Sequence, residues 1–355
     1  PGNAIDFGDL TNPGREGMTG FGGGGRGCFT GGWQRSPSTN IDIIDYVTVA
    51  TIGNAVDFGD LTIARYYLGA CSNGARGLIG PGATYTPWVI RDTIDYVTIA
   101  TTGNAIDFGN FSHVQYQVGA LANETRGLFA GGTTINNIEY VTIATVGNTI
   151  DFGDLTEGRS GPQGTSSSTR GLFMGGNGPS DNTIDYITIA TTGNAADFGD
   201  LTTNHGYGAG TVNSPTRGAW GGGNTGSDVN TIDYITTATT GNAIDFGDRT
   251  TVGYTIEGVS SETRGVFGTG YKGSPAGNLE ILDYITIATT GNAIDFGDLQ
   301  VLVRGAAGTT NGSRGLFSGG YSDSPAGKTN NISYITIATL GDSVDFGDIT
   351  QTVAA

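Results

Sequence analysis

The motif Gly-Asn-Ala-Ile-Asp-Phe-Gly-Asp recurs with small variations along the whole chain and limits what the chain can fold into. It occurs eight times in 355 residues, and successive copies are 44 to 51 residues apart. A period of this length is typical of the blades of a β-propeller, whereas ankyrin, tetratricopeptide and leucine-rich repeats are shorter. The aspartate of each Asp-Phe pair marks one copy, at Asp6, Asp57, Asp107, Asp151, Asp197, Asp245, Asp295 and Asp345.

Three further segments recur seven times between these copies. The first is rich in glycine and small residues, as in residues 305–308, and the second is Arg-Gly-apolar-aromatic followed by glycines, as in residues 126–132. The third is Ile-Asp-Tyr-Ile-Thr-Ile-Ala-Thr, as in residues 184–191. Its β-branched and aromatic residues indicate a strand, and no segment has helical periodicity. We therefore expect about 29 short strands, four per repeat with one over.

The third segment is apolar on both faces, since Ile94 and Tyr96 point one way and Val97 and Ile99 the other. A strand that is buried on both sides belongs in a sheet packed between two others, as a propeller blade is. The glycine-rich segment suits the position nearest the axis, where larger side chains would collide. We expect the order inner, second, third and outer strand within each blade.

These patterns predict an all-β, seven-bladed β-propeller with four antiparallel strands per blade and one extra outer-strand copy at a terminus. Residues 1–355 form a single domain, with repeats at approximately 12–61, 62–111, 112–155, 156–201, 202–249, 250–299 and 300–349. We expect the extra copy in residues 1–11 to be used in ring closure, and the copy in residues 343–347 is the alternative. The chain starts at Pro1 inside a motif, so we also expect it to be part of a longer polypeptide.

The repeat unit resembles two kinds of known repeat. Arg-Gly-x-aromatic-x-Gly-Gly followed by a tyrosine-bearing strand resembles kelch-type propeller units, with Phe where the outer strand of those units usually has Trp. The whole unit is similar to repeats in structural proteins, of the tail or fibre type, of marine tailed phages and especially cyanophages. This resemblance covers essentially the whole chain. It implies a location in the virion and supplies no catalytic residues.

The repeated arginine and aspartate have an architectural interpretation. We expect the Arg of each second strand to pair with an Asp of an outer strand and so to tie blade to blade. Asp-Phe-Gly also binds metal in protein kinases, but here the other kinase motifs are missing. The predicted structural positions are Arg26, Arg76, Arg126, Arg170, Arg217, Arg264, Arg314, Asp57, Asp107, Asp151, Asp197, Asp245, Asp295 and Asp345.

Charge and composition argue against several classes of partner. The formal net charge of −17 and the presence of only two lysines make nucleic acid an unsuitable partner, because phosphate binding needs clustered Lys and Arg. We expect no membrane insertion, since the apolar runs are far shorter than a bilayer span. Cys28 and Cys71 stand at apolar positions of the repeat and are interpreted as buried free thiols.

We expect no enzymatic activity, no cofactor and no bound metal. Propeller enzymes need clustered carboxylates or histidines near the axis. The two histidines, His113 and His205, lie in separate repeats and are interpreted as unpaired surface residues. Calcium held by the two aspartates of each motif, such as Asp6 and Asp9, is the alternative that stays open.

The repeats differ most in the link between second and third strand, which covers residues 133–137 in one repeat and 81–93 in another. In an up-and-down blade this link lies on the same face as the variable link from outer to inner strand. We call this the loop face, where binding is expected. Aromatic and basic residues there suit stacking on sugars or anchoring a protein, although some rings alternatively fold back over the blade edges. The candidates are Trp33, Arg35, Tyr85, Trp88, Arg91, Tyr271, Lys272 and Tyr321.

We therefore expect a non-enzymatic structural or adhesion protein of a tailed-phage virion. Its loop face would bind a host-surface glycan or protein, or other virion proteins. The alternative is a secreted or cell-surface, lectin-like carbohydrate-binding propeller of a marine bacterium. A polysaccharide hydrolase is a weaker third class, because no catalytic cluster stands out.

Overall fold

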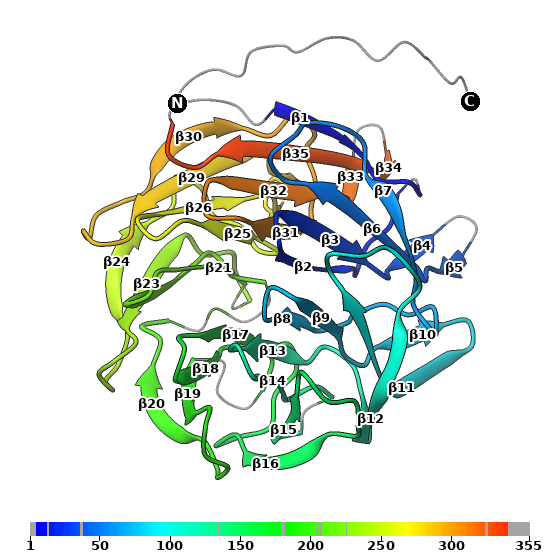
Figure 1. Cartoon of the computed structure of the whole chain (residues 1–355). Helices are drawn as coiled ribbons and strands as arrows, with labels where there is room; N and C mark the ends of the chain where they lie inside the picture. The colour runs from blue at the N-terminus through cyan, green and yellow to red at the C-terminus, as the bar shows by residue number, and fades with distance from the viewer. Residues whose placement is uncertain are drawn as a thin grey trace, which may run out of the picture.

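The chain folds into a ring of seven four-stranded antiparallel blades around a central axis (Figure 1). The computed structural model describes residues 5–12, 14–35, 38–133, 135–178, 182–203, 205, 208–224, 226–323 and 326–339. No helix occurs in these ranges. The predicted all-β, seven-bladed propeller is therefore confirmed. Blades 1 to 7 are numbered by the order of their inner strands along the chain.

Each blade contributes one strand at each distance from the axis, and the second strand always begins at the repeated arginine. The inner strands are β2 (Thr19–Gly23), β8 (Ala70–Ser72), β13 (Gly119–Ala122), β17 (Gln163–Ser166), β21 (Gly210–Asn213), β25 (Glu257–Ser260) and β31 (Ala307–Thr310). The second strands are β3 (Arg26–Thr30), β9 (Arg76–Ile79), β14 (Arg126–Ala130), β18 (Arg170–Met174), β22 (Arg217–Gly221), β26 (Arg264–Gly268) and β32 (Arg314–Ser318).

The third strands carry the Ile-Asp-Tyr segment, and the outer strands carry Asp-Phe-Gly-Asp. The third strands are β6 (Ile43–Thr48), β11 (Trp88–Thr98), β15 (Asn137–Thr142), β19 (Thr183–Thr188), β23 (Thr231–Thr236), β29 (Ile281–Thr286) and β35 (Asn331–Thr336). The outer strands are β7 (Val56–Asp60), β12 (Ile106–Gln115), β16 (Ile150–Asp154), β20 (Ala196–Asp200), β24 (Ile244–Asp248), β30 (Ile294–Asp298) and β1 (Ile5–Asp9).

The N-terminal copy of the motif completes the ring. Strand β1 pairs antiparallel with β35 of blade 7, with Asp6 opposite Ser333. The outer strand of the last blade thus comes from the other end of the chain (Figure 1). The remaining copy, which contains Asp345, lies outside the described residues.

The repeated motif joins each outer strand to the next blade. The Phe58 carbonyl of blade 1 accepts a hydrogen bond from Gly103 N–H in blade 2 at 2.7 Å, and Asp60 N–H donates to Asn104 Oδ1 at 3.2 Å. Gly59, at φ +140°, lies against this turn, and a Cβ there would be 2.5 Å from the Gly103 carbonyl oxygen. The Gly-Asn and Phe-Gly-Asp portions are therefore two halves of one contact between blades.

The second-strand arginines also join neighbouring blades, but the predicted pairing with outer-strand aspartates is wrong. Arg126 Nη1 donates to the Ile189 carbonyl oxygen of blade 4 at 2.6 Å, and its guanidinium lies 4.4 Å from the centre of the Tyr140 ring. All seven arginines make such a bond, at 2.6 to 3.0 Å. The strand register keeps the two side chains apart within a blade. Arg126 stands opposite Thr142 at the end of β15, whereas Asp151 stands opposite Glu139 near its start.

The aspartate of Asp-Phe-Gly accepts a hydrogen bond within its own strand instead. Asp57 Oδ1 accepts from Gly59 N–H at 2.9 Å, which supports the bulge that the glycine makes in β7. The same bond is present at the equivalent aspartates Asp6, Asp107, Asp151, Asp197 and Asp245.

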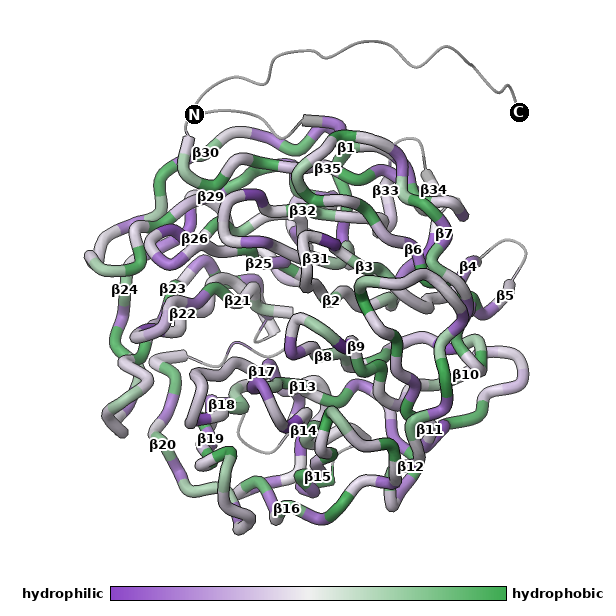
Figure 2. Tube along the Cα trace, in the orientation of Figure 1, coloured by the Kyte–Doolittle hydropathy of each residue, from purple (hydrophilic) through white to green (hydrophobic). Residues whose placement is uncertain are grey.

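The hydrophobic core is divided into seven clusters among the described residues, each lying between two adjacent blades. Phe7 belongs to the cluster between blades 7 and 1, so the point of closure has a core like the other interfaces. Trp220 is buried in the core, and Cys28 and Cys71 are buried free thiols, as expected. Apolar segments are accordingly spread round the whole ring (Figure 2). Within its described residues the chain has no helix of the length and apolarity that crossing a bilayer requires.

Candidate functional site

The loop face carries β-hairpins on four consecutive blades. They are β4 (Trp33–Arg35) with β5 (Ser38–Asn40) in blade 1, β10 (Ala83–Tyr85) with the start of β11 in blade 2, β27 (Tyr271–Gly273) with β28 (Ala276–Asn278) in blade 6, and β33 (Tyr321–Asp323) with β34 (Ala326–Lys328) in blade 7. Blades 6, 7, 1 and 2 follow one another round the ring, so the hairpins form an arc. Figure 1 shows β4, β5, β10, β33 and β34 on one side.

Isolated β-bridges join these hairpins to the links that lead into the inner strands. Glu16 bridges Trp33 in blade 1, and Tyr66 bridges Ala83 in blade 2. The two kinds of link therefore lie together on the loop face. The hairpins of blades 1 and 2 also touch, because Tyr85 N–H donates to Asn40 Oδ1 at 2.8 Å.

Six aromatic rings form a continuous group over blades 1 to 3. Neighbouring ring centres lie 4.5 to 6.5 Å apart, within the range of favourable aromatic pairs. We call them the aromatic cluster: Trp33, Tyr66, Tyr67, Tyr85, Trp88 and Tyr116.

The aromatic cluster combines a buried centre with exposed ends. Tyr66 is buried, and burial together with the neighbouring tyrosines raises its pKa to about 12. Tyr85 and Trp88 are each 48% exposed on the hairpin side, and Tyr67 is 41% exposed toward the axis. A surface with three half-exposed rings packed against a buried one is suited to binding rather than to core packing.

One residue in each link to an inner strand has a left-handed backbone, with φ between +54° and +69° in all seven blades. Four blades place glycine there, which adopts this conformation freely. Blades 2, 3 and 6 have Tyr67, Gln117 and Thr255 instead. A residue with a side chain in this region costs about 1–3 kcal/mol, and such strain concentrates at functional sites. Two of the three, Tyr67 and Gln117, line a cavity on the axis.

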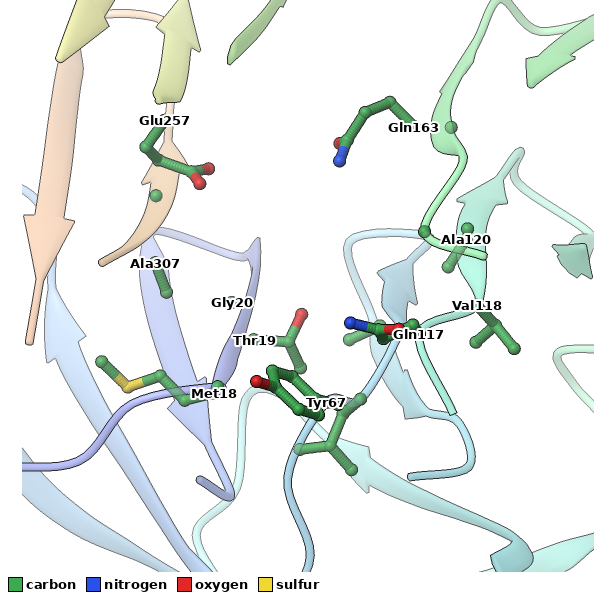
Figure 3. Close-up of a pocket in the computed structure, with 18 of the residues that line it drawn as sticks. Met18, Thr19, Gly20, Tyr67, Gln117, Val118, Ala120, Gln163, Glu257 and Ala307 are labelled. Carbon is green, nitrogen blue, oxygen red and sulfur yellow. The ribbon is translucent and has the colours of Figure 1, made fainter. Parts of the chain in front are cut away.

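This axial cavity has a volume of about 310 Å³ and lies at the loop-face end of the inner strands. Its walls are mostly glycine, alanine and proline, and its polar groups come from five blades. Figure 3 shows the Glu257 carboxylate and the Gln163 amide directed toward each other across the open space. The Thr19 hydroxyl, the Gln117 amide and the Tyr67 phenol border the same space (Figure 3).

Glu257 is the charged group of the axial cavity. It begins β25 and accepts a hydrogen bond from the backbone N–H of Gly308 in blade 7. Burial raises the pKa of Glu257 to about 7, the Gly308 hydrogen bond opposes this shift, and no cation among the described residues offsets it. Burial of this kind favours either the protonated form of a carboxyl group or its pairing with a cation.

Buried ion pairs connect the links that lead into the inner strands with the third strands of three blades. In blade 2, Arg65 Nη1 lies 2.8 Å from Asp95 Oδ2, and neither side chain is exposed. Burial lowers the pKa of Arg65, and the charge of Asp95 offsets part of that shift. Thr62 also donates to the Asp95 carboxylate. Blades 1 and 4 repeat the arrangement with Arg15–Asp45 and Arg159–Asp185, at 2.6 and 2.8 Å.

Blades 6 and 7 fill the positions of this ion pair differently. Blade 6 has Gly253 where blades 1, 2 and 4 have the arginine, and Arg249 enters from the position of a core leucine to lie 3.1 Å from Asp283. Blade 7 lacks both charges, with Val303 and Ser333 in the two places. Blade 3 keeps only the acid, with Gln115 in the arginine position and Glu139 in the aspartate position, both buried.

The two histidines differ from the prediction of unpaired surface residues. His205 is buried at the arginine position of blade 5, with Nε2 3.0 Å from Asp233 Oδ2 and Nδ1 2.5 Å from the Gly222 carbonyl oxygen. The periodicity of the repeat, rather than the polarity of the residue, decides its burial. His113 is 61% exposed, but its Nδ1 lies 3.7 Å from Glu139 Oε1. No group of three metal-ligating side chains occurs among the described residues.

The structure brings some of the predicted binding residues together and separates others. Trp33, Tyr85 and Trp88 belong to the aromatic cluster. Tyr271 and Tyr321 lie in blades 6 and 7 on either side of Arg304, whose guanidinium is 4.5 and 4.6 Å from the two ring centres.

The structure places two of the three predicted basic residues, both in strands of the loop-face hairpins. Lys272 stands opposite Gly277 in a hairpin, and Arg91 stands opposite Gln115 in blade 2. The side chain of Arg35 lies outside the described part of the structure.

Sequence reasoning missed Tyr66, Tyr67, Tyr116, Gln117 and Glu257. The first four stand in links to inner strands, and Tyr67 and Gln117 hold positions that are glycine in four other repeats. Glu257 is the one charged residue among the residues of the seven inner strands. Comparing the repeats with one another position by position would have identified Tyr67, Gln117 and Glu257 as departures.

No protein-family model matches the chain, and no curated protein is significantly similar to it.

Proposed function

We propose that the protein is a non-enzymatic adhesion protein of a tailed-phage virion whose loop face binds carbohydrate on the host surface. The observation that carries the binding role is the aromatic cluster, with its exposed rings Tyr85, Trp88 and Tyr67 fixed around the buried Tyr66. The apolar face of a sugar stacks on such rings, and rigid aromatic anchors lose little entropy on binding.

The virion location is supported by the similarity of the repeat unit to structural proteins of marine tailed phages. In that setting the other face of the ring, with its short and uniform turns, is suited to neighbouring virion proteins. The alternative, a secreted or surface-attached lectin of a marine bacterium, uses the same aromatic cluster on polysaccharide. Labelling of purified phage particles with an antibody against this protein distinguishes the two, since the lectin would be absent from particles.

A glycan array tests the binding role. We expect Trp33→Ala and Trp88→Ala each to weaken binding of the best glycan at least tenfold, about 1.4 kcal/mol, because each removes a stacking surface. Ile244→Ala is the matched control, since Ile244 is 58% exposed at the start of an outer strand. Wild-type protein that binds no glycan, or tryptophan variants that bind as well as Ile244→Ala, would refute the proposal.

A further inference from the structure

The ring position of Glu257 is occupied by neutral residues in the other six blades. The residues in register with it at the start of the inner strands are Thr19, Gly69, Gly119, Gln163, Gly210 and Ala307. A single carboxylate is therefore placed in a ring of small or uncharged groups. It points into a cavity whose size is at the lower end of the range for small-ligand sites.

No cation compensates Glu257 within the described part of the chain. The elements packed on β25 present neutral groups to it: Gly210 and Thr211 from β21, and Ala307 and Gly308 from β31. Its partner across the blade is Gly268 of β26, and the Arg264 guanidinium of that strand is held by a carbonyl of blade 7. Among the described residues, the carboxylate's hydrogen-bond partner is the backbone N–H of Gly308.

The space left beside Glu257 is shaped by the absence of side chains on the adjoining strand. A Cβ on Gly308 would lie 2.6 Å from the Glu257 side chain. Any larger residue at Gly308 would force the Glu257 side chain out of its present position. Opposite, the amides of Gln163 and Gln117 and the hydroxyl of Thr19 supply both donors and acceptors (Figure 3).

We propose that the axial cavity binds a hydroxyl-rich small ligand that carries an ammonium group, such as an amino sugar, with Glu257 as the counter-ion. The ammonium supplies the missing positive charge, and the amides and the hydroxyl bond the ligand's hydroxyl groups. The net charge of −17 favours the approach of a cation to the ring. This site is separate from the stacking surface of Trp33 and Trp88 and goes beyond the proposed function.

The charge state of Glu257 gives the ligand a defined pH dependence. Because the pKa of Glu257 is raised to about 7, the group is mostly protonated at pH 6 and mostly ionised at pH 8. The proton competes with the ammonium group, so cation affinity rises with pH across this window. We expect about a tenfold gain in affinity from pH 6 to pH 8.

Calorimetric titration with three matched sugars tests the proposal: 6-amino-6-deoxyglucose, its N-acetyl derivative and glucose. We expect the amino sugar to bind wild-type protein at least tenfold more tightly than the other two at pH 8. Glu257→Gln removes this preference, whereas Glu262→Gln, in the turn after β25 on the opposite face, retains it. Equal binding of the three sugars, or a preference that survives Glu257→Gln, overturns the proposal.

A second variant keeps the charge but moves it. Gly308→Ala is expected to reduce the preference for the amino sugar at least fivefold, because it displaces the carboxylate. Melting temperatures confirm that the variants are folded, and Glu257→Gln is expected to melt at or above the wild-type temperature at pH 8. A full preference retained in folded Gly308→Ala contradicts the geometry. Trp88→Ala leaves the preference intact, so the two proposals fail separately.

Discussion

Arg65 and Asp95 lie 2.8 Å apart with both side chains fully buried, at a place where blade 7 has Val303 and Ser333. Taking two charges out of water costs several kcal/mol each, and their attraction returns that cost only while both are present. The chain therefore fills these two positions in two ways, with a complete ion pair in blade 2 and with uncharged residues in blade 7. The complete pair holds the link that carries Tyr66 and Tyr67, next to the aromatic cluster.

This comparison predicts an order of stability. Asp95→Ser alone leaves Arg65 buried without its counter-ion and is expected to destabilise the protein by about 3–5 kcal/mol. The double variant Arg65→Val with Asp95→Ser reproduces blade 7 and should recover a large part of this loss. Thermal melting checks the order, and a double variant less stable than Asp95→Ser would contradict the account.

At the scale of the strand, β1 contributes contacts to two blades. It pairs with β35 of blade 7, and the carbonyl of Phe7 accepts from Gly53 N–H of blade 1 at 2.9 Å. Phe7 fills the core between the same two blades, edge-on to the ring of Tyr334 at 5.6 Å. One short strand therefore completes a sheet, a core cluster and a contact between blades.

Deletion of residues 1–11 should thus lower the melting temperature by more than deletion of residues 340–355. It exposes the edge of β35, and unpaired strand edges promote association between chains. Size-exclusion chromatography of the two truncated proteins should show oligomers for the first and not for the second. Equal melting temperatures for the two deletions would show that β1 is not the strand that closes the ring.

The repeat predicted the strand types, their order and the number of blades, because each copy had to bury the same faces. The repeat did not predict which side chains pair with one another. The equivalents of Arg126 and Asp151 recur in every unit. Only the register of β14, β15 and β16 shows that the two residues stand opposite different ends of β15. Tyr67 and Glu257 could not be predicted for the opposite reason, since each occurs in one repeat only and the shared motif carries no information about them.

At the scale of the whole molecule, repetition and recognition occupy different parts of the ring. Contacts between outer strands and neighbouring turns recur round the circle, and each interface has its own core cluster. Departures from the repeat gather on the loop face, in the hairpins of blades 6, 7, 1 and 2 and at the mouth of the axis. A rigid ring that presents one irregular face is the basis of the proposed adhesion role.

Hydrogen exchange of the free protein and of its complex with the best glycan from the array tests this separation most directly. We predict slower exchange in residues 33–40, 82–91 and 115–119, which surround the aromatic cluster and the axial mouth. Exchange in the turns of the opposite face, such as residues 123–125, should not change. Protection confined to those turns, or spread evenly over all seven blades, would contradict the account.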